Sequence, residues 1–117
     1  MEKTIFLDID GCIFKHKGNL SNQILEITEL LPGVTEKINE WNAEDHKIIL
    51  VTGRKESMRK FTEEQLLKHG IFYDQLIMGI TGGERVLIND TKPTKKLIPT
   101  AVAITVERNK GLKSIII

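Results

Sequence analysis

The sequence predicts an α/β fold, a three-layer sandwich around a central, mainly parallel sheet, formed by one domain over residues 1–117. Short apolar runs rich in β-branched residues alternate with a helical pattern, which is typical of parallel strands joined by crossover helices. The chain is large enough for one hydrophobic core and too small for two. In such folds, functional residues gather beyond the carboxyl ends of the strands.

The first strand is expected at residues 4–9, a buried apolar run interrupted near its end by acids. Asp8 and Asp10 are separated by one residue, so both side chains point to the same side of the strand. Two carboxylates this close repel each other unless a cation or a shared proton compensates them. Gly11 then allows a sharp turn.

Residues 12–21 carry the basic triplet Lys15-His16-Lys17, followed by Gly18-Asn19. We expect a short flap here, with a hairpin turn near Gly18-Asn19. Two interpretations stay open, contact between the basic triplet and an anionic substrate, and a solvated hairpin tip. The apolar pattern of residues 24–31 is too short to assign.

A helix is expected after Pro32-Gly33, because Val34, Ile38 and Trp41 recur at spacings of four and three and share one face. We interpret Trp41 as core packing rather than as a stacking platform for substrate. Residues 47–51 form the second strand, and strand, helix, strand implies a right-handed parallel crossover.

The second strand ends in Thr52-Gly53-Arg54-Lys55. A small hydroxyl followed by glycine can donate to a phosphate oxygen, and the turn adds main-chain N–H donors. Thr52 is therefore the candidate phosphate binder. Arg54 and Lys55 either reach the substrate or cover the surface.

Residues 56–70 predict helical structure broken near Phe61, with a capping box formed by Thr62 and Gln65 and a C-terminal cap at Gly70. Further strands are expected in the second half of the chain. They are residues 72–78, residues 84–90 with Asp90 at the tip, and residues 101–106. We expect the apolar end, residues 115–117, to pack as an edge strand or against a partner.

The motif Asp8-Ile9-Asp10-Gly11-Cys12 resembles the first motif of the haloacid dehalogenase (HAD) superfamily, with Cys12 where Thr or Val is commoner. Thr52 and Asp90 match the family's later elements in the right order. The resemblance covers most of the chain and implies a Rossmann-like HAD core. It also implies a capless member, because no insertion large enough for a lid domain separates Asp10, Thr52 and Asp90.

The resemblance further implies a hydrolase, a phosphatase that acts on phosphate monoesters through an aspartyl-phosphate intermediate. Asp8 and Asp10 would be catalytic. Thr52, Gly53 and Arg85 would bind phosphate. The cofactor would be Mg2+, held by metal ligands from Asp8, from Asp10 through its main-chain carbonyl, and from Asp90, since Mg2+ needs few protein oxygens.

One family element departs from this pattern, because no lysine stands between residues 78 and 84. Arg85 and Lys92 are the nearest cations, with Lys68 further away. We expect Arg85 to fill the role, and slow or absent turnover if none does.

The composition and charge of the chain indicate which classes of partner it binds. With 40% hydrophobic residues, 28% charged residues and a net charge of +1, the chain predicts an ordinary soluble protein without a general field for nucleic acid or membranes. A single cysteine, and no signal peptide or apolar membrane span, fit the cytoplasm. An open capless site, and a weak likeness to proteins found with surface-polysaccharide genes, favour a small phosphorylated substrate such as a sugar phosphate, and leave a homo-oligomer open.

Two other functions compete with hydrolysis. A catalytically weak or silent relative would bind a phosphorylated ligand or partner without turning it over. A receiver-like domain would accept a phosphoryl group on aspartate, but receivers place the acceptor after the third strand, where this chain has Met78-Gly79.

Overall fold

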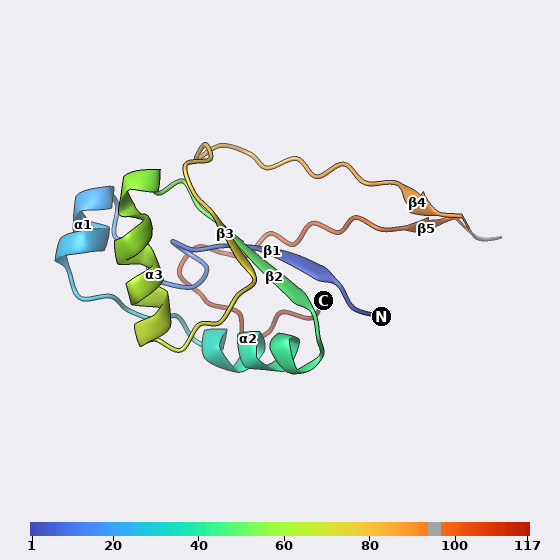
Figure 1. The fold of residues 1–117 in the computed structure, drawn as a ribbon, viewed down its shortest axis with the longest axis horizontal. Coiled ribbons are helices and arrows are strands. Elements are labelled where there is room, and N and C mark those ends of the chain that lie inside the picture. The colour runs from blue at the N-terminus through green and yellow to red at the C-terminus, as the bar shows by residue number, and fades with distance from the viewer. Residues whose placement is uncertain (94–96) are drawn as a thin grey trace.

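The computed structural model describes residues 1–93 and 97–117 and contains a three-stranded parallel sheet, order β1-β2-β3 (Figure 1). The strands are β1 (Thr4–Asp8), β2 (Lys47–Val51) and β3 (Gln75–Ile77). Thr4 pairs with Lys47 and Asp8 with Val51, so the carboxyl ends of β1 and β2 are level with each other. The prediction of an α/β fold with parallel strands is confirmed.

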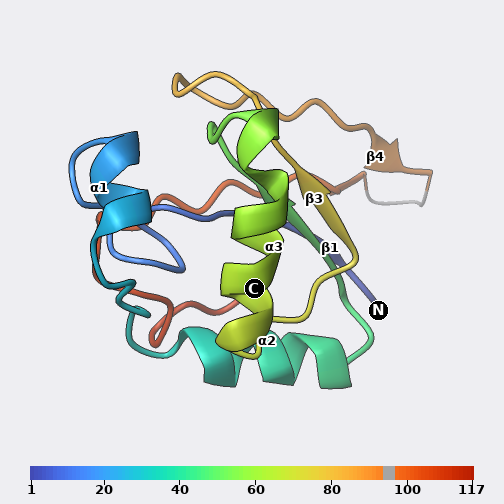
Figure 2. The ribbon, with the colours of Figure 1, turned by 60° about the vertical axis from the view of Figure 1, so that its left-hand side comes forward.

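The helix α2 (Val34–Ala43) connects β1 to β2 and lies along one side of the sheet in both ribbon views (Figures 1 and 2). Its buried residues are Val34, Ile38 and Trp41, as the periodicity predicts. Trp41 is 3% exposed and belongs to the hydrophobic core. Both the helix and the structural role of Trp41 are confirmed.

Within the described ranges, no helix is long and apolar enough to cross a membrane.

The expected flap hairpin is wrong, because a helix, α1 (Leu20–Leu25), follows Gly18-Asn19. The Asn19 side chain accepts a hydrogen bond from the Asn22 main-chain N–H at 2.9 Å, which makes Asn19 an N-cap instead of a turn residue. The two lysines of the basic triplet contact residues that follow α1. Lys15 Nζ lies 3.6 Å from Glu29 Oε2, and the Lys17 side chain, which is 10% exposed, donates through its ammonium to the Ile27 carbonyl.

The second helical stretch begins with the 3-10 turn η1 (Glu56–Met58) and continues as α3 (Arg59–Lys68). The predicted break near Phe61 is wrong, because α3 runs through it. Thr62 is fully buried inside the helix, so it cannot be the start of a capping box. The C-terminal cap is confirmed. Gly70 has a φ of +69°, and its N–H donates to the Leu67 carbonyl at 3.0 Å.

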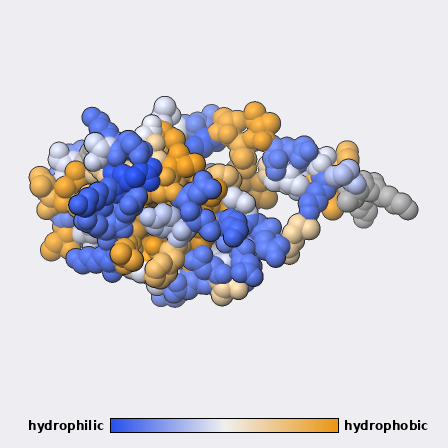
Figure 3. Space-filling model, in the orientation of Figure 1, coloured by the Kyte–Doolittle hydropathy of each residue, from blue (hydrophilic) through white to orange (hydrophobic). Residues whose placement is uncertain are grey.

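The segment after β3 forms a projecting hairpin arm, defined here as residues 80–93 and 97–107 (Figures 1 and 3). Residues 84–90 and 101–106 are not strands, which corrects both expectations. Pairing is found instead between β4 (Thr91–Lys92) and β5 (Ile98–Pro99), in antiparallel register. Closing a short hairpin costs less chain entropy than crossing to a distant strand.

Beyond these two pairs, the two legs of the arm have no strand hydrogen bonds among the described residues. Thr91 pairs with Pro99 and Lys92 with Ile98, and continuing that register would set Val86 opposite Ile104. Several apolar side chains of the legs are exposed, including Val86 (77%), Ile88 (89%) and Val102 (78%). The arm therefore has the sequence of strands but is not part of the main sheet.

The C-terminal segment returns to the body of the protein. The N–H of Asn109 donates to the Gly11 carbonyl at 2.9 Å, and that of Leu112 donates to the Pro32 carbonyl at 2.9 Å. Ile115 and Ile117 pack against the core, while Ile116 is 86% exposed. The apolar end therefore packs against the core and does not form the edge strand, which was one of the two expectations for it.

Candidate active site

The candidate site lies at the carboxyl ends of the two adjacent strands β1 and β2. Asp8 is the last residue of β1, Asp10 follows it by two, and Thr52 comes directly after β2. Because Asp8 pairs with Val51, the next residue, Thr52, is at the same edge. Gly11 has a φ of +97°, the left-handed region in which glycine is favoured, so it allows the turn after the acids.

Asp10 forms a two-point ion pair with Arg54. Arg54 Nε donates to Asp10 Oδ2 at 2.8 Å, and Nη2 donates to Oδ1 at 2.7 Å. The arginine side chain is 1% exposed and the aspartate side chain 15%. Bidentate pairs of this kind are strong and fix the plane of the carboxylate. The sequence suggested that Arg54 either reaches the substrate or covers the surface. In the structure it is instead a buried partner of Asp10.

The third guanidinium nitrogen is held by α3. Arg54 Nη1 donates to Thr62 Oγ1 at 3.1 Å and to Gln65 Oε1 at 2.8 Å. Its guanidinium carbon also lies 6.0 Å from the centre of the Phe14 ring. A buried cation is tolerated only when its donors find acceptors, and here each of the three guanidinium nitrogens has at least one. Thr62 and Gln65, which the sequence analysis interpreted as a capping box, therefore hold Arg54 in place, and Arg54 in turn orients Asp10.

Gln23 of α1 is a further partner of Asp10 that the sequence did not indicate. Its Nε2 donates to Asp10 Oδ1 at 2.7 Å, and the side chain is buried. In the sequence, Gln23 directly precedes the apolar pattern of residues 24–31, which was too short to assign. Only the fold brings it within reach of an acid thirteen residues earlier.

Asp8 has a different environment from Asp10. Its carboxylate is one-third exposed, and Arg85 Nη2 lies 3.8 Å from its Oδ1. Burial raises the pKa of Asp8 above its ordinary value, and the positive charge of Arg85 opposes this by lowering it. The structure thus brings Arg85 to the first acid, although no strand carries it there. Of the other cations considered, Lys92 lies in the arm with Nζ 2.7 Å from Met1 Sδ, and Lys68 is on α3.

Thr52 is 1% exposed, and its Oγ1 accepts a hydrogen bond from the Arg54 main-chain N–H at 3.1 Å. The hydroxyl proton is still able to donate. Gly53 follows in a tight turn, where an added Cβ would lie 3.3 Å from the Ile80 carbonyl oxygen. The loop after β2 is thus closely packed against the chain that leaves β3.

The predicted magnesium ligands do not meet in this conformation. The Asp8 carboxylate lies beside a cation instead, with its Oδ1 3.8 Å from Arg85 Nη2. Asp90 is exposed in the hairpin arm, where its carbonyl accepts from the Thr100 hydroxyl. Across residues 1–93 and 97–117, no group of three or more His, Cys, Asp or Glu side chains could hold a metal ion. Oxygen donors are the right type for Mg2+, but their placement does not fit it here.

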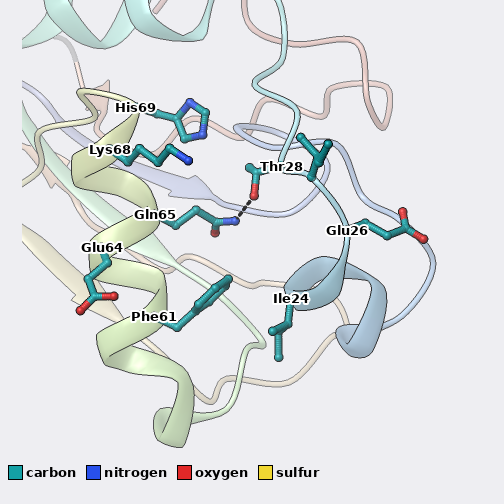
Figure 4. A pocket seen from close by; sticks show the side chains of 9 residues that line it. Ile24, Glu26, Thr28, Phe61, Glu64, Gln65, Lys68 and His69 are labelled. Carbon is teal, nitrogen blue, oxygen red and sulfur yellow. Dashed lines mark hydrogen bonds between the residues drawn. The ribbon is translucent and has the colours of Figure 1, made fainter.

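Next to this cluster, an open groove of about 540 Å³ separates α1 from α3 (Figure 4). Phe61 and Gln65 of α3 and the cap residue His69 project into it, and Ile24 and Thr28 face them. The Gln65 amide donates to the Thr28 hydroxyl across the groove. Because Gln65 also holds Arg54, one hydrogen-bonded chain joins the groove to Asp10.

No protein-family model matches the chain. No curated protein matches it either.

Solved structures are similar to it. A chain of the Pnkp1/Rnl/Hen1 complex superposes with a TM-score of 0.59 at 27% sequence identity, covering 74% of this chain and 31% of that one. A chain of the Pnkp1/Rnl/Hen1 RNA repair complex gives 0.59 at 28% identity, covering 72% and 28%.

A structural-genomics target from Vibrio cholerae gives a TM-score of 0.52 at 23% identity, covering 77% of this chain and 80% of that one. This last likeness concerns the fold alone. The chain spans under a third of the length of the RNA repair chains that it matches.

Proposed function

We propose that this chain is a phosphate monoester hydrolase with a capless HAD-like core, and that it acts through an aspartyl phosphate on Asp8. One observation carries the proposal. Two carboxylates with different environments stand at one strand end, Asp8 partly open to solvent and Asp10 fixed by Arg54. Hydrolysis in two steps needs one carboxylate as a nucleophile and another to transfer protons.

In the proposed reaction, a carboxylate oxygen of Asp8 attacks the phosphorus, and the bond from phosphorus to the leaving oxygen breaks. Before this step the Asp10 carboxylate binds a proton from solvent at Oδ2, and the leaving oxygen takes that proton. Water then attacks the phosphorus of the aspartyl phosphate, Asp10 takes a proton from that water, and the bond from phosphorus to Asp8 breaks. Inorganic phosphate is released and both acids return to their starting forms.

The charge on the transferred phosphoryl group needs donors close to Asp8. Arg85 supplies a cation 3.8 Å from the Asp8 carboxylate. The Thr52 hydroxyl and the turn at Gly53 supply neutral donors at the end of the neighbouring strand. These groups would orient the phosphate and offset its charge as it approaches the nucleophile.

Magnesium is the cofactor that the HAD resemblance implies, and its bound charge would offset that of the nucleophile and the phosphoryl group. The ligands in this conformation do not fit it, so the steps above use only the chain's own residues. Assays with added Mg2+ and with chelator test the dependence directly.

Two substrate classes are candidates. The first is a sugar phosphate or a similar small phosphometabolite, as the sequence indicates. The second is the terminal phosphate of a polynucleotide, which is supported by likeness to chains of an RNA repair complex at 27% and 28% identity. An open, capless site would admit either.

The test measures inorganic phosphate released from sugar phosphates, p-nitrophenyl phosphate and an oligonucleotide with a terminal phosphate. Each substrate is offered to the parent chain and to Asp8→Asn, with Mg2+ and with chelator. We expect release by the parent and a loss of at least about a hundredfold in the variant. Arg59→Met, at a half-exposed position on α3, is the control for substitution outside the cluster around Asp8.

Other outcomes assign the two alternative functions. A stable acyl phosphate formed from a small phosphodonor with negligible turnover would identify a receiver-like domain. A saturable thermal shift with a phosphorylated ligand, and no turnover, would identify a silent binder. Turnover that persists in Asp8→Asn would contradict the proposed nucleophile.

A further inference from the structure

Gln23 is placed to control which oxygen of Asp10 can react. A carboxylate has about four acceptor positions, two on each oxygen. Oδ1 accepts from Arg54 Nη2 and from Gln23 Nε2, both at 2.7 Å, and Oδ2 accepts from Arg54 Nε at 2.8 Å. Among the contacts of the described residues, the remaining acceptor position is on Oδ2.

The orientation of the Gln23 amide follows from its other partner. Gln23 Oε1 accepts a hydrogen bond from the Lys17 main-chain N–H at 2.5 Å. A main-chain N–H can only donate, so the carbonyl side of the amide must face Lys17, and the NH2 side must face Asp10. Gln23 is 6% exposed, which leaves its side chain little freedom to turn away.

The helix that carries Gln23 is itself tied to Lys17. Asn22 Nδ2 donates to the Lys17 carbonyl at 2.9 Å, and the Gln23 N–H donates to the Asn19 carbonyl at 3.1 Å. Asn22 and Gln23 are neighbours on α1, but only Gln23 contacts Asp10. The pair therefore offers a test site and a matched control on the same helix.

We propose that Gln23 is a positioning residue for Asp10, and that it occupies Oδ1 so that protons are exchanged with the leaving oxygen through Oδ2. This inference rests on the proposed function and deepens it. Arg54 alone fixes the plane of the carboxylate, but it leaves acceptor positions on both oxygens. The neutral amide of Gln23 removes the choice at Oδ1 without adding charge to the site.

The test compares substrates that differ in their need for proton donation. p-Nitrophenyl phosphate has an acidic leaving group that departs without much help, whereas an alkyl phosphate needs its leaving oxygen protonated. We expect Gln23→Ala to lower kcat for the parent's best alkyl phosphate by about tenfold or more, with KM unchanged. With p-nitrophenyl phosphate, we expect kcat to stay within about threefold.

Two further variants control for damage to the fold. Gln23→Met keeps the volume of the side chain and should behave like Gln23→Ala. Asn22→Ala removes a hydrogen bond from the same helix without touching Asp10 and should stay within about twofold on both substrates. Equal losses on both substrates in the Gln23 variants, or no loss on either, would overturn the role of Gln23. A parent chain that hydrolyses neither substrate would instead overturn the proposed function.

Discussion

Arg54 and Asp10 are joined through two nitrogens and two oxygens, at 2.8 and 2.7 Å, in a pair whose arginine side chain is 1% exposed. The pair connects the loop after β2 to the turn after β1, and α3 holds it from behind through Thr62 and Gln65. Arg54 thus contributes both to the stability of the fold and to the orientation of Asp10, the proposed general acid and base. The predictions below separate these two effects.

Replacing Arg54 with methionine should destabilise the fold strongly. Removing one member of a buried ion pair leaves the other charge uncompensated and typically costs about 3–5 kcal/mol. Urea unfolding followed by circular dichroism measures the free energy of unfolding. Arg59→Met removes a half-exposed arginine that contacts Glu56 and Glu63 and donates to the Leu76 carbonyl at 3.0 Å, and should cost clearly less, about 1–2 kcal/mol. Equal costs at the two positions would contradict the buried pair.

Thr62 should matter for its hydroxyl rather than for its shape. Thr62→Val keeps the volume but removes one of the two acceptors of Arg54 Nη1, at 3.1 Å, and leaves the Gln65 bond in place, so it should cost about 1–3 kcal/mol. Thr62→Ser retains the hydroxyl and should recover most of that loss, measured in the same unfolding experiment. A valine variant as stable as the parent would show that Arg54 does not depend on the Thr62 hydroxyl.

Gly111→Ala should disrupt the packing of the C-terminal segment. A Cβ at this position would lie 2.1 Å from the Pro32 carbonyl oxygen, and the residue has a φ of +84°. Gly70→Ala is the matched control, because its φ is +69° but nothing lies within 4 Å of the added atom. We expect a cost of about 1–2 kcal/mol for Gly70→Ala and clearly more for Gly111→Ala, read as shifts in Tm. Similar shifts would contradict the close approach.

Cys12 should react slowly with alkylating reagents. Burial, followed by the negative charge of Asp8, raises the pKa of its thiol to about 11 from 9.0. The thiolate is the nucleophile, so at pH 8 its fraction falls about a hundredfold below that of a thiol with the ordinary pKa. Alkylation by iodoacetamide, followed by mass spectrometry, should be slow in the parent and faster in Asp8→Asn. Rates equal to those of the unfolded chain would contradict this environment.

The local and periodic features of the chain could be predicted from its sequence. The run from Ile5 to Leu7 and the spacing of Asp8 and Asp10 predict a strand with acids at its end, and Val34, Ile38 and Trp41 predict α2. These signals are short in range and depend on side-chain alternation and helical period. The structures that they predict therefore depend little on contacts with distant parts of the chain.

Contacts across the chain could not be predicted in the same way. Gln23, Arg54 and Thr62 meet at Asp10 only because the fold brings α1, the loop after β2 and α3 together. The spacing of Thr62 and Gln65 places both on one helix face, which was a usable signal, but it also fits a capping box. Residues 84–90 have the sequence of a strand, yet strand propensity depends strongly on which neighbour is present to pair with it.

The most direct test is to trap the proposed intermediate on Asp8. With p-nitrophenyl phosphate carrying a radioactive phosphorus, Asp10→Asn should still form the aspartyl phosphate, because this leaving group needs little protonation. It should hydrolyse the intermediate slowly, because the base is missing. The account predicts an acid-stable, hydroxylamine-sensitive label on Asp8 that is absent when Asp8 is also changed to Asn. Turnover by the parent with no label on Asp8 would contradict it.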